Sequence, residues 1–268
     1  MSKPIAMSSL VTLRCPSCGA PLRLNDERCE YCSSIVLVAQ PAELALPAVA
    51  QAQKLAAQMR ERLTLNPYDG DAYYQLGLAT FTLGRYDQAE NAFDQAQRYL
   101  PGSAVAHYFK GLAMLLSKQD DILGVADFRL HLIQRELETA RELDPNLRVT
   151  DAYLNFLRGL QLRNQQKYRQ AIAPLQDAAN ALSDLAVIYK VLAACYFQIG
   201  DLPKAIENAK RALELRPTDI DLAYMLGSAH ARLEQFNEME NYAHRVAALR
   251  GEPTQWYEVV REFHGQFD

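Results

Sequence analysis

The chain has 268 residues, of which 49% are hydrophobic, and its formal net charge is −4 at pH 7. This composition supports a substantial core, and the mildly acidic balance gives no overall attraction to nucleic acid or to an anionic membrane. No stretch reaches the ~20 apolar residues of a membrane helix, and the first residues lack the ~7–15 apolar residues of a signal peptide. We therefore expect a cytoplasmic protein with no membrane span, whose thiols are kept reduced.

Four of the five cysteines lie close together near the start of the chain, as two C-x2-C pairs: Cys15 with Cys18 and Cys29 with Cys32. Four thiolates at this spacing form a closed tetrahedral set for Zn²⁺, with no position left for a substrate. A short strand-like run follows each pair. The pattern resembles a zinc ribbon, which implies a small β module at residues 1–39 that binds one Zn²⁺ per chain, followed by a linker at 40–50.

Three roles are open for this module. The metal can simply hold together a segment that is too small to fold alone. Oxidation of the thiols could release the metal as a redox switch. The ribbon could also contact nucleic acid, but residues 1–40 carry four basic and three acidic side chains, so they form no basic patch. The ribbon is therefore interpreted as an accessory docking module.

An internal repeat fills the rest of the chain. Gly77, Gly111, Gly159, Ala193 and Gly227 occupy equivalent positions, separated by 34 residues except for 48 between Gly111 and Gly159. Small residues, aromatic residues and a closing proline recur in the same register. This period resembles the tetratricopeptide repeat, a helix-turn-helix unit that must stack on its neighbours to bury its apolar face.

The resemblance implies an all-α fold over residues 51–268: an α-solenoid of about five helix-turn-helix units with flanking helices. The stretch before Pro67 predicts a lone first helix. The stretch from Trp256 to Phe263 predicts a final helix with one apolar face, which either caps the last repeat or joins two copies of the chain. The 14 extra residues of the second unit lie mostly between Leu116 and His131 and are expected to extend the helix pair or form a loop.

The resemblance also implies a partner-binding concave face, lined by the first helix of each unit. Spacings of 3 and 4 residues place one set of side chains on that face. The set comprises Tyr74, Leu78, Phe81, Tyr108, Leu112, Leu115, Phe156, Leu160, Arg163, Lys190, Phe197 and Tyr224. Such an apolar, aromatic surface favours a protein partner, with Arg163 and Lys190 as isolated cations. The alternative is that the insertion folds inward and these residues form core.

No catalytic motif is present: the chain has no Gly-rich phosphate loop and no H-E-x-x-H. The five histidines are scattered, and His107 is expected to serve packing. The sequence therefore favours a non-enzymatic adaptor or scaffold that docks an apolar peptide or amphipathic helix. Two alternatives are a nucleic-acid-associated regulatory factor that uses the ribbon, and a scaffold that self-assembles through the Trp256 helix.

Overall fold

The structure is a computed structural model that describes residues 46–265, with side chains through Phe263. The predicted ribbon, with Cys15, Cys18, Cys29 and Cys32, lies outside these residues.

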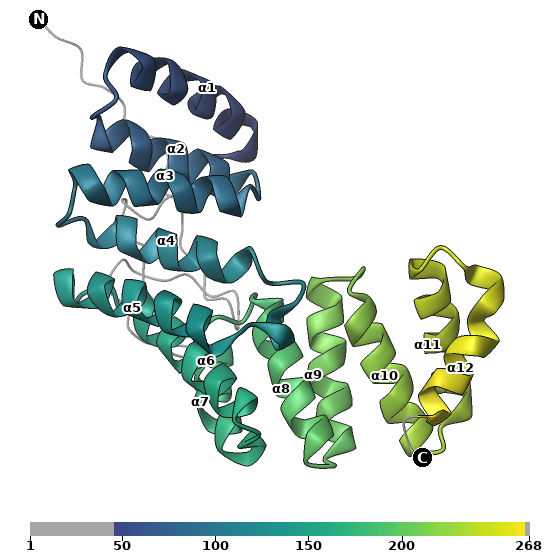
Figure 1. Ribbon diagram of the computed structural model, residues 1–268. Coiled ribbons are helices and arrows are strands. Elements are labelled where there is room, and N and C mark those ends of the chain that lie inside the picture. The colour runs from purple at the N-terminus through teal and green to yellow at the C-terminus, as the bar shows by residue number, and fades with distance from the viewer. Residues whose placement is uncertain (1–45, 266–268) are drawn as a thin grey trace, which may run out of the picture. The chain divides into compact units, whose positions relative to one another are not determined.

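Every regular element within residues 46–265 is a helix, and consecutive helices lie side by side (Figure 1). The α-helices are α1 (Val49–Leu65), α2 (Gly70–Thr82), α3 (Tyr86–Tyr99), α4 (Ala104–Leu116), α5 (Asp127–Leu143), α6 (Val149–Asn164), α7 (Tyr168–Ala181), α8 (Ala186–Gln198), α9 (Leu202–Leu215), α10 (Ile220–Arg232), α11 (Phe236–Leu249) and α12 (Trp256–Gly265). Two short 3₁₀ turns are η2 (Ile122–Gly124) and η3 (Pro253–Gln255).

The helices form the five predicted pairs: α2 with α3, α4 with α5, α6 with α7, α8 with α9, and α10 with α11. Helix α1 packs on α2, and α12 packs on α10 and α11, as the predicted flanking helices require. Asp69, Ser103 and Asp219 each precede a first helix and accept a hydrogen bond from a backbone N–H of its first turn. These N-caps satisfy donors that the helix itself leaves unpaired.

The repeated small residue is needed because a large side chain fills the space beside it. A Cβ atom at Gly77 would lie 2.4 Å from the ring of Phe93, which belongs to the second helix of the same unit. In the last unit the equivalent Gly227 faces Phe263 of α12, where the corresponding distance would be 2.2 Å. In the last unit, Phe263 of the final helix therefore takes the place that Phe93 of the second helix takes in the first unit.

The turn between the two helices of a unit also repeats. Gly84, Gln166, Gly200 and Glu234 have φ values of 70°, 60°, 81° and 57°, and the last three are 34 residues apart. This left-handed conformation costs an L-residue roughly 1–2 kcal/mol and costs glycine almost nothing. Units three and five therefore hold a non-glycine residue at a position that favours glycine.

Replacing Gln166 or Glu234 by glycine is expected to stabilise the chain by about 0.5–1 kcal/mol, because the relief of strain exceeds the entropy that glycine adds to the unfolded chain. Urea denaturation followed by circular dichroism measures the change. The reverse substitution, Gly84→Ala, serves as the control and should destabilise by about 1 kcal/mol. A loss of stability in both glycine variants would contradict this account.

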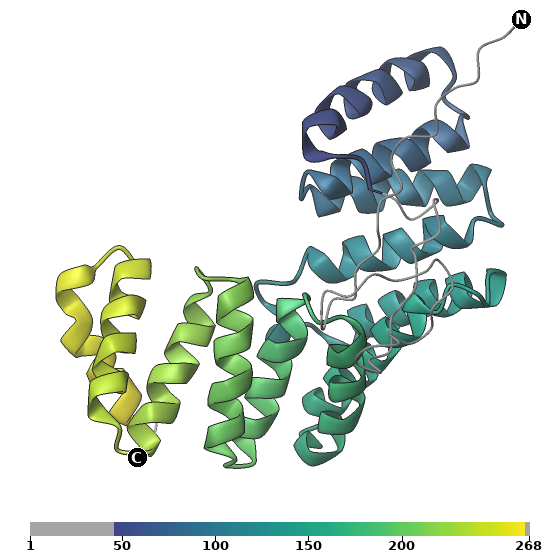
Figure 2. The same ribbon diagram turned by 180° about the vertical axis from the view of Figure 1, so that it is seen from behind.

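The second unit departs from the others in its connection. Three residues join the two helices in units one, three, four and five, whereas ten residues, 117–126, join α4 to α5. This connection contains η2 and passes beside α8 (Figures 1 and 2). Seven of the 14 extra residues predicted for this unit therefore form a loop with one 3₁₀ turn. Residues 127–131 of the predicted insertion belong to α5, which has 17 residues where the second helices of the other units have 14.

Candidate functional site

The side chains predicted to face a partner differ in how open they are. We call the surface formed by α2, α4, α6, α8 and α10 the first-helix face. Eight of the twelve predicted side chains are buried in this structure: Leu78, Phe81, Tyr108, Leu112, Leu115, Phe156, Leu160 and Lys190. Four are partly exposed: Tyr74, Arg163, Phe197 and Tyr224. That a partner docks on this set of side chains stays a prediction. In this structure only the four partly exposed side chains are accessible to such a partner.

Several buried aromatic residues of the set pack between repeats. The ring of Tyr108 meets that of Tyr153 edge to face, with 6.0 Å between centroids. Burial raises the pKa of Tyr108 well above its usual value and that of Tyr153 to about 12, so both phenols are neutral at physiological pH. Phe81 packs on Phe109 of the next unit at 5.6 Å. These rings join neighbouring units, which is how a repeat array gains its stability.

A short segment of the long connection lies against the first-helix face. We call residues 119–125 the inserted segment. Side chains from outside it hold its backbone carbonyls: Arg163 donates to Leu123 O, and Asn164 Nδ2 donates to Val125 O at 3.0 Å. Both donors lie at the end of α6. Further along the array, Lys190 Nζ lies 3.3 Å from the carbonyl oxygen of Asp120. The inserted segment is therefore held by side-chain donors of two first helices.

Lys190 is the most deeply buried charge among the predicted residues, and its environment differs from the expected isolated cation. Its Nζ lies 3.0 and 3.1 Å from the two carboxylate oxygens of Asp219 and 2.8 Å from Asp221. Only 2% of Lys190 is exposed. Asp219 is the N-cap of α10 and Asp221 lies in its first turn, so the start of this helix brings both carboxylates to the ammonium group and neutralises it within the array. A charge this deeply buried needs such partners.

Arg216 and Asn164 complete the contacts of the inserted segment. Arg216 forms an ion pair with the Asp120 carboxylate and lies 3.4 Å from the carbonyl of Gln119. Asn164 Nδ2 also donates to Asp127 Oδ1 at 2.9 Å, where α5 begins. The helical spacing that selected the face residues omits both, because Arg216 lies in a turn and Asn164 at a helix end. Asn164 directly follows Arg163 in the sequence, whereas Arg216 lies 26 residues after Lys190 and has no such signal.

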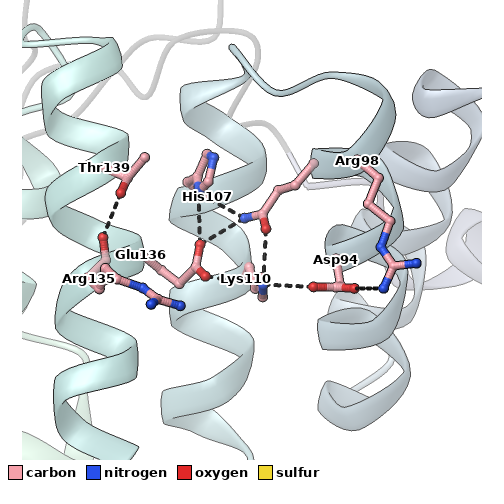
Figure 3. A network of polar contacts seen from close by, with 8 residues as sticks. Asp94, Arg98, His107, Lys110, Arg135, Glu136 and Thr139 are labelled. Atoms are coloured by element: carbon pink, nitrogen blue, oxygen red, sulfur yellow. Dashed lines mark hydrogen bonds and ion pairs between the residues drawn. The ribbon is translucent and has the colours of Figure 1, made fainter.

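A partly buried polar network lies across α3, α4 and α5 (Figure 3). Glu136 of α5 accepts hydrogen bonds from Gln97 at 2.9 Å and contacts His107 Nδ1 at 2.8 Å. Lys110 lies 3.1 Å from Glu136 and 2.9 Å from Asp94. Lys110 stands where the first, fourth and fifth units have Leu76, Leu192 and Leu226, and the Glu136 carboxylate compensates its charge. His107 was expected to serve packing, but it takes part in this network.

The network lowers the pKa of Glu136. Burial raises it, but the hydrogen bond with His107 and the cation of Lys110 outweigh burial and lower the pKa from 4.5 to about 2. Because the pKa is lower in the folded chain, the ionised carboxylate stabilises the fold above pH 4.5, and this contribution is lost as the pH falls toward 2.

The variant Glu136→Gln has no carboxylate to titrate at this position. Between pH 6 and pH 3.5, the stability difference between parent and variant should therefore narrow by about 1 kcal/mol. Urea denaturation at the two pH values measures it. Glu142→Gln, at an exposed position of the same helix, should follow the pH dependence of the parent. A constant difference between parent and Glu136→Gln would contradict the lowered pKa.

Two other kinds of site are absent from the described part of the chain. Residues 46–265 contain no helix that is both long and apolar enough to cross a membrane. The same residues bring together no group of three or more His, Cys, Asp or Glu side chains that could hold a metal. Cys195 is fully buried in α8, and burial raises its pKa to about 12, so its thiol is protonated.

Comparison with known families identifies the repeat class. The tetratricopeptide repeat family matches residues 70–99 and residues 186–219, which are the first and fourth units. The described part of the chain is thus a helical array that contains tetratricopeptide repeats.

Three relatives illustrate the sequence similarity. Protein IFIT1 homolog B of Homo sapiens is 26% identical over 60% of this chain and 33% of its own length. The Hsp70-Hsp90 organizing protein of Triticum aestivum is 27% identical over 45% of this chain and 20% of its own length. TOM70, a mitochondrial import receptor subunit of Saccharomyces cerevisiae, is 35% identical over 30% of this chain and 13% of its own length. The match spans a third or less of each relative.

Solved structures show the same fold. The Cut9–Hcn1 hetero-tetramer of APC/C contains a chain that matches 80% of this one with a TM-score of 0.57 and 16% identity, over 40% of its own length. PilW, a type IV pilus biogenesis factor, matches 80% of this chain with a TM-score of 0.52 and 18% identity, over 90% of its own length. At these identities the likeness concerns the arrangement of helices.

Proposed function

We propose that the chain is a non-catalytic protein-interaction scaffold that docks a peptide or an amphipathic helix on its first-helix face. The observation that carries the proposal is the inserted segment, because side-chain donors of α6 and α8 hold its carbonyls on that face. A surface that binds a peptide backbone in this way has the donors that peptide recognition needs.

The relatives support the same class of function. An organizing protein and an import receptor subunit are named for handling other proteins. What they share with this chain is the repeat region, so we extend to this chain the general role and not their partners.

Site-specific photo-crosslinking tests the docking face. A benzoylphenylalanine at Phe197, which is partly exposed on α8, should form an adduct with the partner protein in cells that express the chain. The same probe at Glu207, which is exposed on the second helix α9, is the matched control. Adducts at Glu207 alone, or equally at both positions, would show that the partner binds elsewhere.

We also propose that Cys15, Cys18, Cys29 and Cys32 bind one structural Zn²⁺ as an accessory docking module. The support is the ligand type and the C-x2-C spacing of the sequence. Zinc would supply the stability that so short a segment cannot obtain from a core of its own.

Cys15→Ser or Cys29→Ser is expected to reduce the zinc content from about one to about zero per chain, because a structural site needs all four ligands. Elemental analysis of the purified chain measures it. The helical circular dichroism of the repeats should stay unchanged. Cys195→Ala, at the buried cysteine of α8, should keep its zinc. Full zinc content in Cys15→Ser would contradict the four-thiolate site.

A further inference from the structure

We propose that the inserted segment is an intramolecular ligand, which occupies the place on the first-helix face that a partner peptide takes. The inference rests on the proposed function and adds the chemistry of the partner. The partner is a short peptide in which an acidic residue precedes a branched apolar residue by two positions, as Asp120 precedes Ile122. Binding of the partner then requires the inserted segment to leave.

The inserted segment is bound as a peptide is bound. Ile122 and Val125 are buried, whereas Asp120, Asp121 and Gly124 are exposed. Apolar anchors between exposed neighbours are typical of a peptide lying on a surface. The 3₁₀ turn that carries Ile122 packs on α8. The anchor and the carbonyl contacts together specify a ligand of about seven residues.

The connection does not need its extra length. The four other units join their helices with three residues, so the second unit has seven more than the turn requires. The seven extra residues can therefore leave the face, or be substituted, while the rest of the connection still joins α4 to α5. Loops of this kind tolerate changes of length and composition at a small entropic cost.

The buried cation of the face keeps its counter-ions when the inserted segment leaves. Lys190 keeps Asp219 and Asp221, both of which belong to the start of α10 and not to the segment. Arg216 loses Asp120, but this arginine is partly exposed and can be solvated. No buried charge therefore loses its counter-ion when the segment leaves. The cost of leaving a buried charge unpaired would otherwise hold the segment in place.

The test uses the 268-residue chain with residues 119–125 replaced by seven glycine and serine residues. The probe is a fluorescent peptide with the sequence of residues 117–127, SKQDDILGVAD. Fluorescence anisotropy should show at least tenfold tighter binding of the peptide to the replaced chain than to the parent. A peptide with aspartate in place of Ile122 is the control, and it should bind at least tenfold more weakly.

Adding Arg163→Met to the replaced chain should also weaken binding of the probe, since Arg163 is a donor to the segment's backbone. Equal binding of the probe and its aspartate control, or no binding by a folded replaced chain, would overturn the proposal.

A milder variant covers the case in which the replaced chain does not fold. Ile122→Ala in the otherwise native chain removes part of the anchor and keeps every carbonyl contact. It should bind the probe more tightly than the parent does, and an affinity no higher than that of the parent would overturn the proposal.

Photo-crosslinking at Phe197 separates the two ideas. If the yield of partner adduct is the same in the parent and in the Ile122→Ala chain, the inserted segment is not an intramolecular ligand, but the proposal that a partner docks on the first-helix face still holds. If neither chain forms an adduct, the proposal that a partner docks on the first-helix face is itself contradicted.

Discussion

Replacing Lys190 by methionine is expected to lower the free energy of unfolding by about 3–5 kcal/mol, the range for breaking a buried ion pair from one side. The methionine keeps most of the volume, so the loss is electrostatic. The Asp219 side chain, which is 5% exposed, would lose the cation that neutralises it. Asp219 also caps α10 through the N–H of Leu222 at 3.1 Å, so the start of that helix should be affected as well.

Urea denaturation followed by circular dichroism measures this loss. Arg141→Met is the matched control, because Arg141 forms an ion pair with Asp151 in which both side chains are about half exposed. That surface pair should contribute at most about 1 kcal/mol. Similar small losses in the two variants would contradict the assignment of Lys190 as a buried, paired charge.

Replacing Phe263 by alanine is expected to lower the stability of the C-terminal end of the array by about 3–5 kcal/mol, as large-to-small changes in a core do. Phe263 is fully buried, faces Gly227 and packs edge to face on Tyr224 at 5.0 Å. The cavity would separate α12 from α10 and α11. Since a repeat array is held together by neighbour contacts, this end should unfold before the rest.

The single tryptophan, Trp256, begins α12 and reports on this end directly. In Phe263→Ala its fluorescence should change at a lower urea concentration than the helical circular dichroism does. Tyr257→Ala, at an exposed position of the same helix, should shift neither transition. If the two signals of Phe263→Ala coincide at the parent midpoint, α12 does not cap the array as the structure indicates.

The repeat period predicted most of the fold because each unit must bury the same face. The equivalent glycines and the closing prolines were sufficient to predict five helix pairs and both flanking helices, all of which the structure contains. The 34-residue interval could also have located the left-handed turn at Gln166 and Glu234, since Gly84 and Gly200 occupy the same place.

The contacts of the inserted segment could not be predicted by the same means. A repeat pattern describes what units share, and residues 119–125 have no counterpart in the other units. The partners of Lys190 escaped prediction because Asp219 and Asp221 lie 29 and 31 residues away, in the next unit. The contact of Glu136 could not be predicted for a similar reason. Its partner Lys110 interrupts the repeat pattern, and only the three-dimensional contact between the two side chains explains this lysine.

Hydrogen–deuterium exchange in the native chain tests the central claim most directly, namely that the first-helix face binds a peptide and now holds residues 119–125. The amides of this segment should exchange at least tenfold faster than those of α6 and α8, and faster still when the peptide of residues 117–127 is added in excess. Exchange of the segment at the rate of α8, unchanged by the peptide, would contradict the account, because the segment would then be a permanent part of the core.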